Sequence, residues 1–537
     1  MVFPSINIAS TTPYNQGFTG GASGWAAAGA NSSWVVGAPA KNLLRAENGN
    51  AWYTGSGINS YNNNEQSYVE CPCLNMSTLQ RPMLSMRAFL STDQNSDGAV
   101  VLYSINDGLN WEVLGAVNNG VNWYNSRGLL GNPGSQSFTA NPRTWTGSSV
   151  GWSGNSTRKW QDVKFSLDQV LRDLQNPALN PTGRVRFRVA FGSNADNPPG
   201  DTLDGFAFDN VFVGERNRLV LLEHFTNSSS SDALTENTFI NNFRTPAEVV
   251  NVQYHTEFPN RTPFNLDNPA DPSARALLYG VSAVPRTALD GATIATQRFS
   301  QWGDAAFSRR TLDQAPLQID VSFRAQSDGR LDVTANLLAL ENFADTVLVH
   351  FVVIERQAQE TAGGPVLRNV VKRMLPNAAG TRVMANWVQG TTRSFNQTWQ
   401  PSGFRDIGQL SVVVFVQSER TGIVQQAAIA SPPASTVFSL VTSLDQSSLA
   451  DAGEGSVRIY PNPAQDELII QLDKAFPLEG QWSVVDNGGR LIESGLLTSG
   501  EQIHRLDVSA YAVGTYQLLL KQTGSKELIT KRFVIVR

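Results

Sequence analysis

The sequence predicts a multidomain, mainly β protein, and three observations support this. The chain has 537 residues, more than one hydrophobic core usually organises, so we expect several domains. Its 44 glycines and 26 prolines suit many short strands joined by turns. Short runs in which apolar and polar residues alternate recur along the chain, as is typical of strands with one buried face.

Residues 1–216 are predicted to form a jelly-roll β-sandwich. The strand expected at 184–191 places Val and Phe on one face and Arg or Ala on the other. Glycine- and aromatic-containing motifs, among them 108–111 and 205–211, resemble a jelly-roll module of large surface proteins that is related in outline to MAM-like and reelin-type repeats. Tryptophans such as Trp111 and Trp152 could stack on sugars, but in a β-sandwich they more often pack the core.

The two cysteines of the chain, Cys71 and Cys73, flank Pro72. Residues i and i+2 of a strand point to the same face, with a spacing at the edge of disulfide geometry. We expect two half-buried thiols on a strand, and a strained bridge only if Pro72 bends the chain. No His or further Cys lies nearby in the sequence, so a metal site here is not expected.

The loop from Asp93 to Gly98 matches the first half of a calcium-binding loop. Asp93, Asn95 and Asp97 place oxygen atoms at alternate positions, the ligand type that Ca²⁺ prefers. The flanking segments are expected strands, so this is not an EF-hand. A polar hairpin turn is the favoured interpretation and calcium is the alternative, and no other cofactor is expected.

Residues 217–315 change to a strand–helix–strand pattern. Apolar runs at 219–223 and 249–254 are expected strands, 233–243 has helical spacing, and a last helix is expected at 300–310. The motifs Glu223-His224-Phe225-Thr226-Asn227 and Val284-Pro285-Arg286-Thr287 resemble those of a family of thioredoxin-like surface proteins of Bacteroidota-type bacteria. The resemblance implies a thioredoxin-like domain, and it extends into the segment that follows.

That family carries a C-x-x-C pair where this sequence has Ser230-Ser231-Asp232-Ala233. Thiol–disulfide exchange needs a thiolate and a second, resolving thiol, and neither Ser230 nor Ala233 supplies one. We therefore expect a redox-inactive domain in which Ser230 or Ser231 caps the helix. Pro285 corresponds to the family's cis-proline and is expected to shape a groove that could bind peptide without reacting.

The rest of the chain returns to strand patterns. Residues 316–434 are predicted to form a second β-sandwich, with alternating runs such as 317–323 and 410–416. Residues 435–456 are polar and small, as in a linker. Residues 457–537 are predicted to form one more small β-sandwich, whose last strand runs to the final residue.

The last domain resembles the type A sorting domain of type IX secretion cargo (the Por secretion tail). The residues that carry the resemblance are Tyr460, Pro461, Asn462, Pro463, Gly488, Gly489, Arg490, Gly514, Tyr516, Lys531 and Arg537. It implies export to the outer surface of a diderm bacterium, or release from it. It also implies, as partners, the secretion translocon and its outer-membrane shuttle or sortase.

Composition excludes several other classes. The net charge of −5 and the lack of long Lys/Arg runs argue against nucleic acid as a partner, and no apolar stretch is long enough for a membrane span. The four histidines, His224, His255, His350 and His504, fall in three predicted domains, so no zinc cluster is expected. The first residues lack a charged and apolar export leader, so we expect the natural leader to be missing or the chain to be a fragment.

These patterns predict a non-enzymatic adhesin or scaffold at the cell surface, with a glycan or a protein as its ligand. One alternative is a subunit of an extracellular filament or of the secretion or gliding machinery. Another is a glycan-binding or glycan-active surface enzyme, although the sequence alone assigns no pair of catalytic carboxylates.

Overall fold

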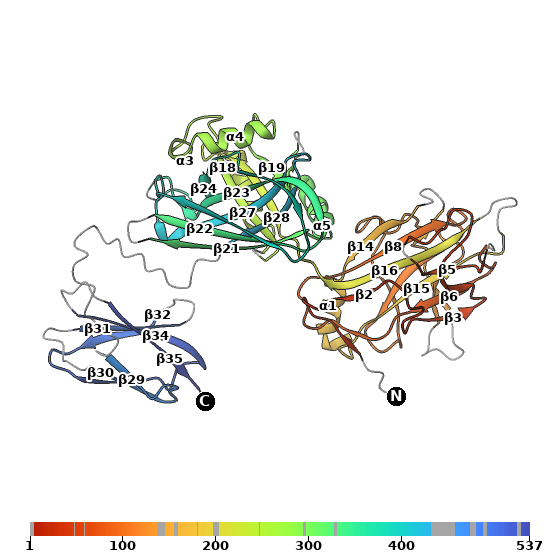
Figure 1. Ribbon diagram of the computed structural model, residues 1–537, viewed down its shortest axis with the longest axis horizontal. Helices are drawn as coiled ribbons and strands as arrows, with labels where there is room; N and C mark the ends of the chain where they lie inside the picture. The colour runs from red at the N-terminus through yellow and green to blue at the C-terminus, as the bar shows by residue number, and fades with distance from the viewer. Residues whose placement is uncertain are drawn as a thin grey trace.

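The structure is a computed structural model. It describes residues 5–536 except 48, 58–59, 137–144, 155–158, 180, 197–202, 246, 294–296, 327–329, 362, 431–456, 473–479, 487–490 and 523–527. Most of the described chain forms β-sheets, and helices are few (Figure 1). The multidomain, mainly β architecture predicted from the sequence is confirmed.

The N-terminal part is a β-sandwich of two six-stranded sheets. One sheet contains β3 (Ala26–Ala30), β6 (Gln66–Glu70), β9 (Gly98–Ser104), β10 (Glu112–Val113), β13 (Trp152–Ser153) and β15 (Arg186–Gly192). The other contains β2 (Tyr14–Gln16), β4 (Trp34–Gly37), β5 (Ala51–Thr54), β8 (Pro82–Ser91), β14 (Gln161–Ser166) and β16 (Gly205–Glu215). Smaller elements complete it: β1 (Ile6–Asn7), β7 (Leu74–Asn75), β11 (Gly134–Gln136), β12 (Trp145–Gly147), α1 (Asp168–Gln175) and η1 (Pro177–Leu179).

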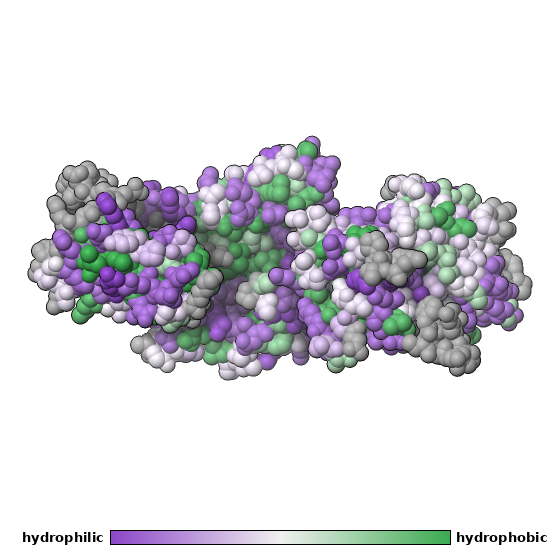
Figure 2. Space-filling view, turned by 90° about the horizontal axis from the view of Figure 1, so that it is seen from below, coloured by the Kyte–Doolittle hydropathy of each residue, from purple (hydrophilic) through white to green (hydrophobic). Residues whose placement is uncertain are grey.

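Aromatic side chains fill the space between these two sheets. Trp123, Tyr124 and Trp152 are at most 2% exposed and contact one another edge to face or tilted. Their burial confirms the core interpretation and leaves them no face for a sugar. Trp111 is only partly buried. The face of this sandwich seen in Figure 2 is mostly polar or intermediate in hydropathy, consistent with 16% charged residues in the whole chain.

A nine-stranded sheet forms the centre of the middle part. Its strands are β17 (Val220–Thr226), β18 (Val249–His255), β19 (Arg286–Leu289), β20 (Ala292–Thr293), β23 (Phe343–Ala358), β24 (Leu367–Leu375), β25 (Thr381–Trp387), β27 (Leu410–Ser418) and β28 (Val424–Ile429). The helices here are α2 (Ser231–Asn242), α3 (Pro263–Asp267), α4 (Ala270–Leu278), α5 (Phe299–Arg310) and the short η2 (Ile407–Gln409). A three-stranded sheet of β21 (Leu317–Ala325), β22 (Leu331–Ala339) and β26 (Thr392–Trp399) packs against it through a shared apolar core.

The predicted boundary at residue 316 does not separate two sheets. Strand β18 pairs in parallel with β24 through Gln253 and Val370, so strands from 217–315 and from 316–434 belong to one sheet. Leu221, Val252 and Phe415 share one core cluster across that boundary. The two predicted domains therefore form a single folded body.

Charged and polar side chains join the N-terminal sandwich to the middle part. Arg216 donates to both carboxylate oxygens of Asp168 at 2.7 Å and to the hydroxyl of Thr311 at 3.1 Å. Lys164 of β14 pairs with Asp313 at 3.2 Å. These contacts link α1 and β14 to the segment that follows α5.

The C-terminal part is a small sandwich of two sheets. One contains β29 (Val457–Tyr460), β30 (Glu467–Leu472) and β33 (Ile503–Asp507), and the other contains β31 (Gly480–Asp486), β32 (Leu491–Leu497), β34 (Gly514–Gln522) and β35 (Leu528–Ile535). Alternate residues such as Leu468, Ile470, Leu518 and Phe533 are completely buried between them. The predicted linker, 435–456, lies outside the described residues.

Candidate functional site

The Tyr-Pro-Asn-Pro segment packs against the last strand of the C-terminal sandwich. The side chain of Asn462 accepts a hydrogen bond from the backbone N–H of Val534 at 2.9 Å and donates to the carbonyl of Arg532 at 3.1 Å. Ala464 continues this contact, with its N–H 2.8 Å from the Val534 carbonyl. The side chain of Asn462 thus imitates a backbone pairing partner and covers part of the open edge of β35.

The last strand supplies core side chains to the same sandwich. Phe533 and Ile535 are 0% exposed, and the ring of Tyr516 stacks on Phe533 at 5.6 Å. Gly514 begins β34 opposite Ile535. Removing β35 would therefore remove two buried side chains and open the edge of β34.

Of the other predicted sorting residues, some lie at the surface of the sandwich and the rest lie outside the described residues. Tyr460, Pro461 and Pro463 are exposed, and Lys531 is half-buried on β35, so the motif presents a surface as well as packing the fold. Gly488, Gly489, Arg490 and Arg537 lie outside the described residues. The sequence identified the motif, but the bond from Asn462 to β35 is visible only in the structure.

Ser230 and Ala233, where the sequence resemblance placed the missing redox pair, belong to the start of helix α2. Ser230 is the N-cap of α2, and its hydroxyl accepts from the backbone N–H of Ala233 at 3.2 Å, as the capping hypothesis expected. Ala233 and Pro285 are buried. The preceding Ser228 donates to Glu360, from the segment between β23 and β24, at 2.7 Å, so this segment contacts the loop before the helix.

Three of the four histidines belong to one sheet, which corrects the expectation that the four lie in three domains. His224, His255 and His350 lie on β17, β18 and β23 and are at most 2% exposed. Burial lowers the pKa of His224 to about 4 and that of His255 to about 3, and it moves the pKa of His350 well below its usual value. Within the described ranges, no group of three His, Cys, Asp or Glu side chains is arranged to hold a metal ion.

The side-chain oxygen atoms of two of the three predicted calcium ligands, Asn95 and Asp97, already have protein partners. The carboxylate of Asp97 is buried and accepts from the Tyr61 hydroxyl at 2.7 Å and from the N–H of Asn194 at 2.8 Å. The side-chain oxygen of Asn95 accepts from Ser126 at 3.0 Å. Burial raises the pKa of Asp97, which also disfavours a charged ligand. Asp93 is half-buried at the start of the turn. These contacts favour the hairpin-turn interpretation over calcium.

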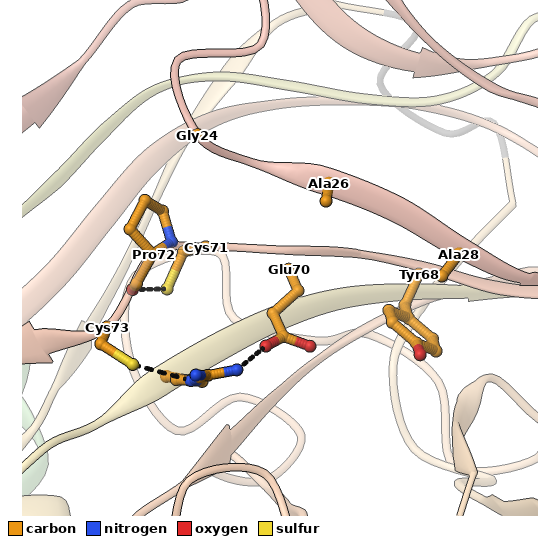
Figure 3. A pocket seen from close by; sticks show the side chains of 9 residues that line it. Gly24, Ala26, Ala28, Tyr68, Glu70, Cys71, Pro72 and Cys73 are labelled. Atoms are coloured by element: carbon orange, nitrogen blue, oxygen red, sulfur yellow. Dashed lines mark hydrogen bonds and ion pairs between the residues drawn. The ribbon is translucent and has the colours of Figure 1, made fainter. Parts of the chain in front are cut away.

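A recess of about 440 Å³ opens on the outer side of the first sheet (Figure 3). Ala26 and Ala28 of the edge strand β3 line it together with Tyr68, Glu70 and Arg186. Glu70 accepts from both Arg186 and Arg188 at 2.7 Å. The guanidinium of Arg188 in turn lies 3.8 Å from the ring centres of Tyr68 and Trp111. The alternating Arg residues of 184–188 were visible in the sequence as a signal for this cluster. The sequence did not show that β6, which carries Tyr68 and Glu70, is the strand that pairs with them.

The cysteines line the same recess, and both differ from expectation. They lie between β6 and β7 rather than on a strand, and they are 4% and 3% exposed rather than half-buried. Both are free thiols. The sulfur of Cys71 accepts from the N–H of Phe187 at 3.1 Å. The sulfur of Cys73 accepts from Arg186 Nε at 2.8 Å (Figure 3). Burial raises the pKa of Cys71 to about 12, so this thiol stays protonated.

Comparison with known proteins identifies a family for the C-terminal sandwich and several similar solved structures. Residues 458–536 match the family described as secretion system C-terminal sorting domain. No curated protein matches the sequence. Among solved structures, HBP35 of Porphyromonas gingivalis is similar at 12% identity and a TM-score of 0.34, covering 60% of this chain and 98% of that one. The K1 adhesin domain of Lys-gingipain from P. gingivalis W83 is similar at 14% identity and a TM-score of 0.22, covering 38% and 98%.

The family match fits the structural findings on the C-terminal sandwich, where the Tyr-Pro-Asn-Pro segment and the last strand form one unit. None of the helices in the described part of the chain is both long and apolar enough to span a membrane. The chain therefore carries a secretion-system sorting domain at residues 458–536, which directs its export by type IX secretion to the cell surface or outer membrane.

Proposed function

We propose that this protein is a non-enzymatic adhesin or scaffold displayed at the cell surface. The observation that carries the proposal is the sorting domain, because a signal for surface export serves the domains that precede it. A translocon and an outer-membrane shuttle or sortase would read the exposed part of the Tyr-Pro-Asn-Pro segment. The two bodies before it would then face the exterior of the cell.

The recess beside β3 is the proposed contact site for a ligand. Its floor is made of small side chains, Ala26 and Ala28, and its wall combines the Tyr68 ring with the Glu70–Arg186 ion pair. Rings and planar hydrogen-bonding groups around an open floor suit a glycan or a peptide segment. A volume of about 440 Å³ is in the range of small-ligand sites.

Replacing Ala28 by Trp should fill the recess and weaken binding of the purified chain to immobilised glycans and matrix proteins by about tenfold or more. Ala30→Trp is the matched control: Ala30 lies on the same exposed strand but does not line the recess, so binding should persist. The measurement is binding to an array at several protein concentrations. Equal loss in both variants, or no binding by the unchanged chain, would argue against this site.

We also infer that residues 217–315 form a thioredoxin-like domain without thiol chemistry. In support, the strand order β20-β19-β17-β18, with β17 and β18 parallel and β19 antiparallel, is that of a thioredoxin-type sheet. The cap at Ser230 marks where the first thiol would stand at the helix N-terminus.

The chain should not reduce insulin disulfides, because Ser230 and Ala233 supply no thiolate. Ser230→Cys with Ala233→Cys should create a dithiol that oxidises reversibly, whereas Ser230→Cys alone should not. The measurement is insulin turbidity together with thiol titration against redox buffers. Turnover by the unchanged chain would contradict the inference, and a double variant that cannot oxidise would show the alignment to be wrong.

A second candidate, a glycan-active enzyme, is favoured by one further pocket. The hydroxyl of Tyr103 lies 3.0 Å from Glu112 and 2.8 Å from Asp173, so these two carboxylates are neighbours in a polar recess of about 370 Å³. Most glycosidases use a pair of carboxyl groups as their catalytic residues. Release of reducing sugar that stops in Glu112→Gln would favour this function over the adhesin.

A further inference from the structure

Lys372 and Glu355 form a completely buried pair on neighbouring strands of the middle sheet. Nζ of Lys372 on β24 lies 3.0 Å from Oε2 of Glu355 on β23, and the two side chains are 1% and 0% exposed. The register between the strands shifts between Val353 and Ile354, which leaves Lys372 as the extra residue of a bulge, while Glu355 itself pairs with Val370. Both side chains thus come from paired strands of the sheet and not from flexible surface segments.

The contact is an unusual ion pair. Neither Nζ of Lys372 nor Oε2 of Glu355 has a hydrogen-bond partner of good geometry. A buried ion pair ordinarily needs such bonds to offset the cost of removing two charges from water. Burial lowers the pKa of Lys372, which favours the neutral amine, the nucleophilic form of lysine.

The second oxygen of the same carboxyl group is held by two backbone donors. Oε1 of Glu355 accepts from the N–H of Arg405 at 2.8 Å and from the N–H of Asp406 at 2.6 Å. Two N–H groups on one carboxyl oxygen are the arrangement that stabilises the oxyanion of a tetrahedral intermediate in acyl transfer. One oxygen of Glu355 therefore faces an amine and the other faces an oxyanion-type site.

A third side chain is placed to move protons. Oδ2 of Asp267, at the end of α3, lies 3.5 Å from Nζ of Lys372 and 2.8 Å from Arg405 Nη1. The Phe264 ring lies 4.4 Å below the amine and covers the pair from the side of α3. The carboxylate of Asp267 is therefore positioned beside the amine, and the ring keeps water away from the amine.

We propose that Lys372 and Glu355 become joined by an intramolecular amide bond that the folded protein forms by itself. A proton passes from the ammonium group to Oε2, which gives a neutral amine and a neutral acid. Nζ attacks Cδ of Glu355, and the negative charge on Oε1 is held by the N–H groups of Arg405 and Asp406. Asp267 takes a second proton from Nζ and gives it to the Oε2 hydroxyl, which leaves as water while the C–O bond breaks. Nζ keeps one hydrogen, and no oxidant or cofactor is consumed.

Mass spectrometry of the purified full chain after trypsin cleavage tests this bond. Cleavage should leave residues 331–356 joined to residues 369–373, because trypsin does not cut after a modified Lys372. The joined peptide should weigh one water molecule less than its two parts. Recovery of only the separate linear peptides, 331–356 and 369–372, from folded protein would overturn the proposal.

Variants separate the bond from a plain ion pair. Lys372→Arg keeps the charge but should lose the joined peptide completely, and Asp267→Asn keeps both reacting groups but should greatly reduce the joined fraction. Lys164→Arg is the control, because Lys164 makes a partly exposed pair with Asp313 and should leave the joined peptide unchanged. A joined peptide that persists in full in Asp267→Asn would remove Asp267 from the mechanism.

Discussion

A reporter fused to residues 435–537 behind a periplasmic export signal should reach the cell surface or the medium of a host with type IX secretion. The same reporter without residues 533–537 should remain in the periplasm. Phe533 and Ile535 are both completely buried, so the deletion removes core side chains and the pairing partner of β34. Losses of this kind cost several kcal/mol, roughly 2–5 for each large buried side chain, which a domain of this size cannot absorb. The measurement is cell fractionation with surface protease treatment.

Point variants separate folding of the sorting domain from its recognition. Asn462→Ala removes the two bonds to β35 and should destabilise the sandwich by about 1–3 kcal/mol, with a partial loss of export. Arg505→Ala is the matched control, since it breaks only an exposed pair with Glu467, worth about 1 kcal/mol or less. Equal localisation of the reporter with and without residues 533–537 would contradict the claim that this domain carries the export signal.

Acid should destabilise the middle body steeply as the pH falls below about 6.5. His224, His255 and His350 have folded-state pKa values held below their ordinary value by burial. The unfolded chain therefore binds more protons than the folded chain in this range, so stability is complete above pH 6.5 and is lost as the pH drops. Each histidine contributes about 1.4 kcal/mol per pH unit, so the three together give about 4 kcal/mol per unit towards pH 4.

The buried Asp290 acts in the opposite direction. Burial raises the pKa of this carboxyl, so the folded state takes up its proton first and gains stability as the pH falls towards its ordinary range. Three histidines act against this single carboxyl, so the histidines should dominate between pH 6.5 and 5. The measurement is hydrogen exchange of β17, β18 and β23 in the full chain at pH 7, 6 and 5.

His255→Leu should remove about one third of this slope. Both ring nitrogens of His255 lack a hydrogen-bond partner in the fold, so an apolar side chain loses no bond there and stability at pH 7 should not fall by much. His504→Leu is the control, because His504 lies in the sorting domain and pairs with Glu501. A slope that is unchanged in His255→Leu would show that this histidine is protonated in the folded state.

Local patterns in the sequence were sufficient for most of the elements. Strict alternation predicted strand 184–191, which the structure has as β15, and helical spacing predicted 233–243, which lies within or directly after α2. Ser230 as a cap also followed from local chemistry, since a hydroxyl before a helix accepts a bond from its first turn. The last strand was predicted to reach the final residue, and β35 ends at Ile535. The first and last residues of a strand depend on the strands that pair with it, and a local sequence pattern does not reveal those partners.

The contacts of the predicted calcium loop could not be derived in this way. The alternating oxygen atoms of 93–97 are a correct reading of the sequence, but the carboxylate of Asp97 turns inward to Tyr61, thirty-six positions away. A side chain's partners in a sandwich come from strands that are distant in sequence, and one sequence contains no record of which strands meet. The prediction that Cys71 and Cys73 are half-buried was wrong for the same reason. Phe187 and Arg186, on the distant strand β15, donate hydrogen bonds to the two sulfur atoms and cover them.

By itself the sequence determined the mainly β class and the sorting domain, because alternation and the Tyr-Pro-Asn-Pro motif are local and survive in a single chain. Only the tertiary structure decided that residues 217–315 and 316–434 form one body, since the pairing of Gln253 with Val370 joins strands more than a hundred positions apart. It alone also brought Asp267, Glu355 and Lys372 together from three elements. Long-range pairing is selected by the burial of whole sheet faces, and that free energy belongs to the assembled layers, not to any local stretch of sequence.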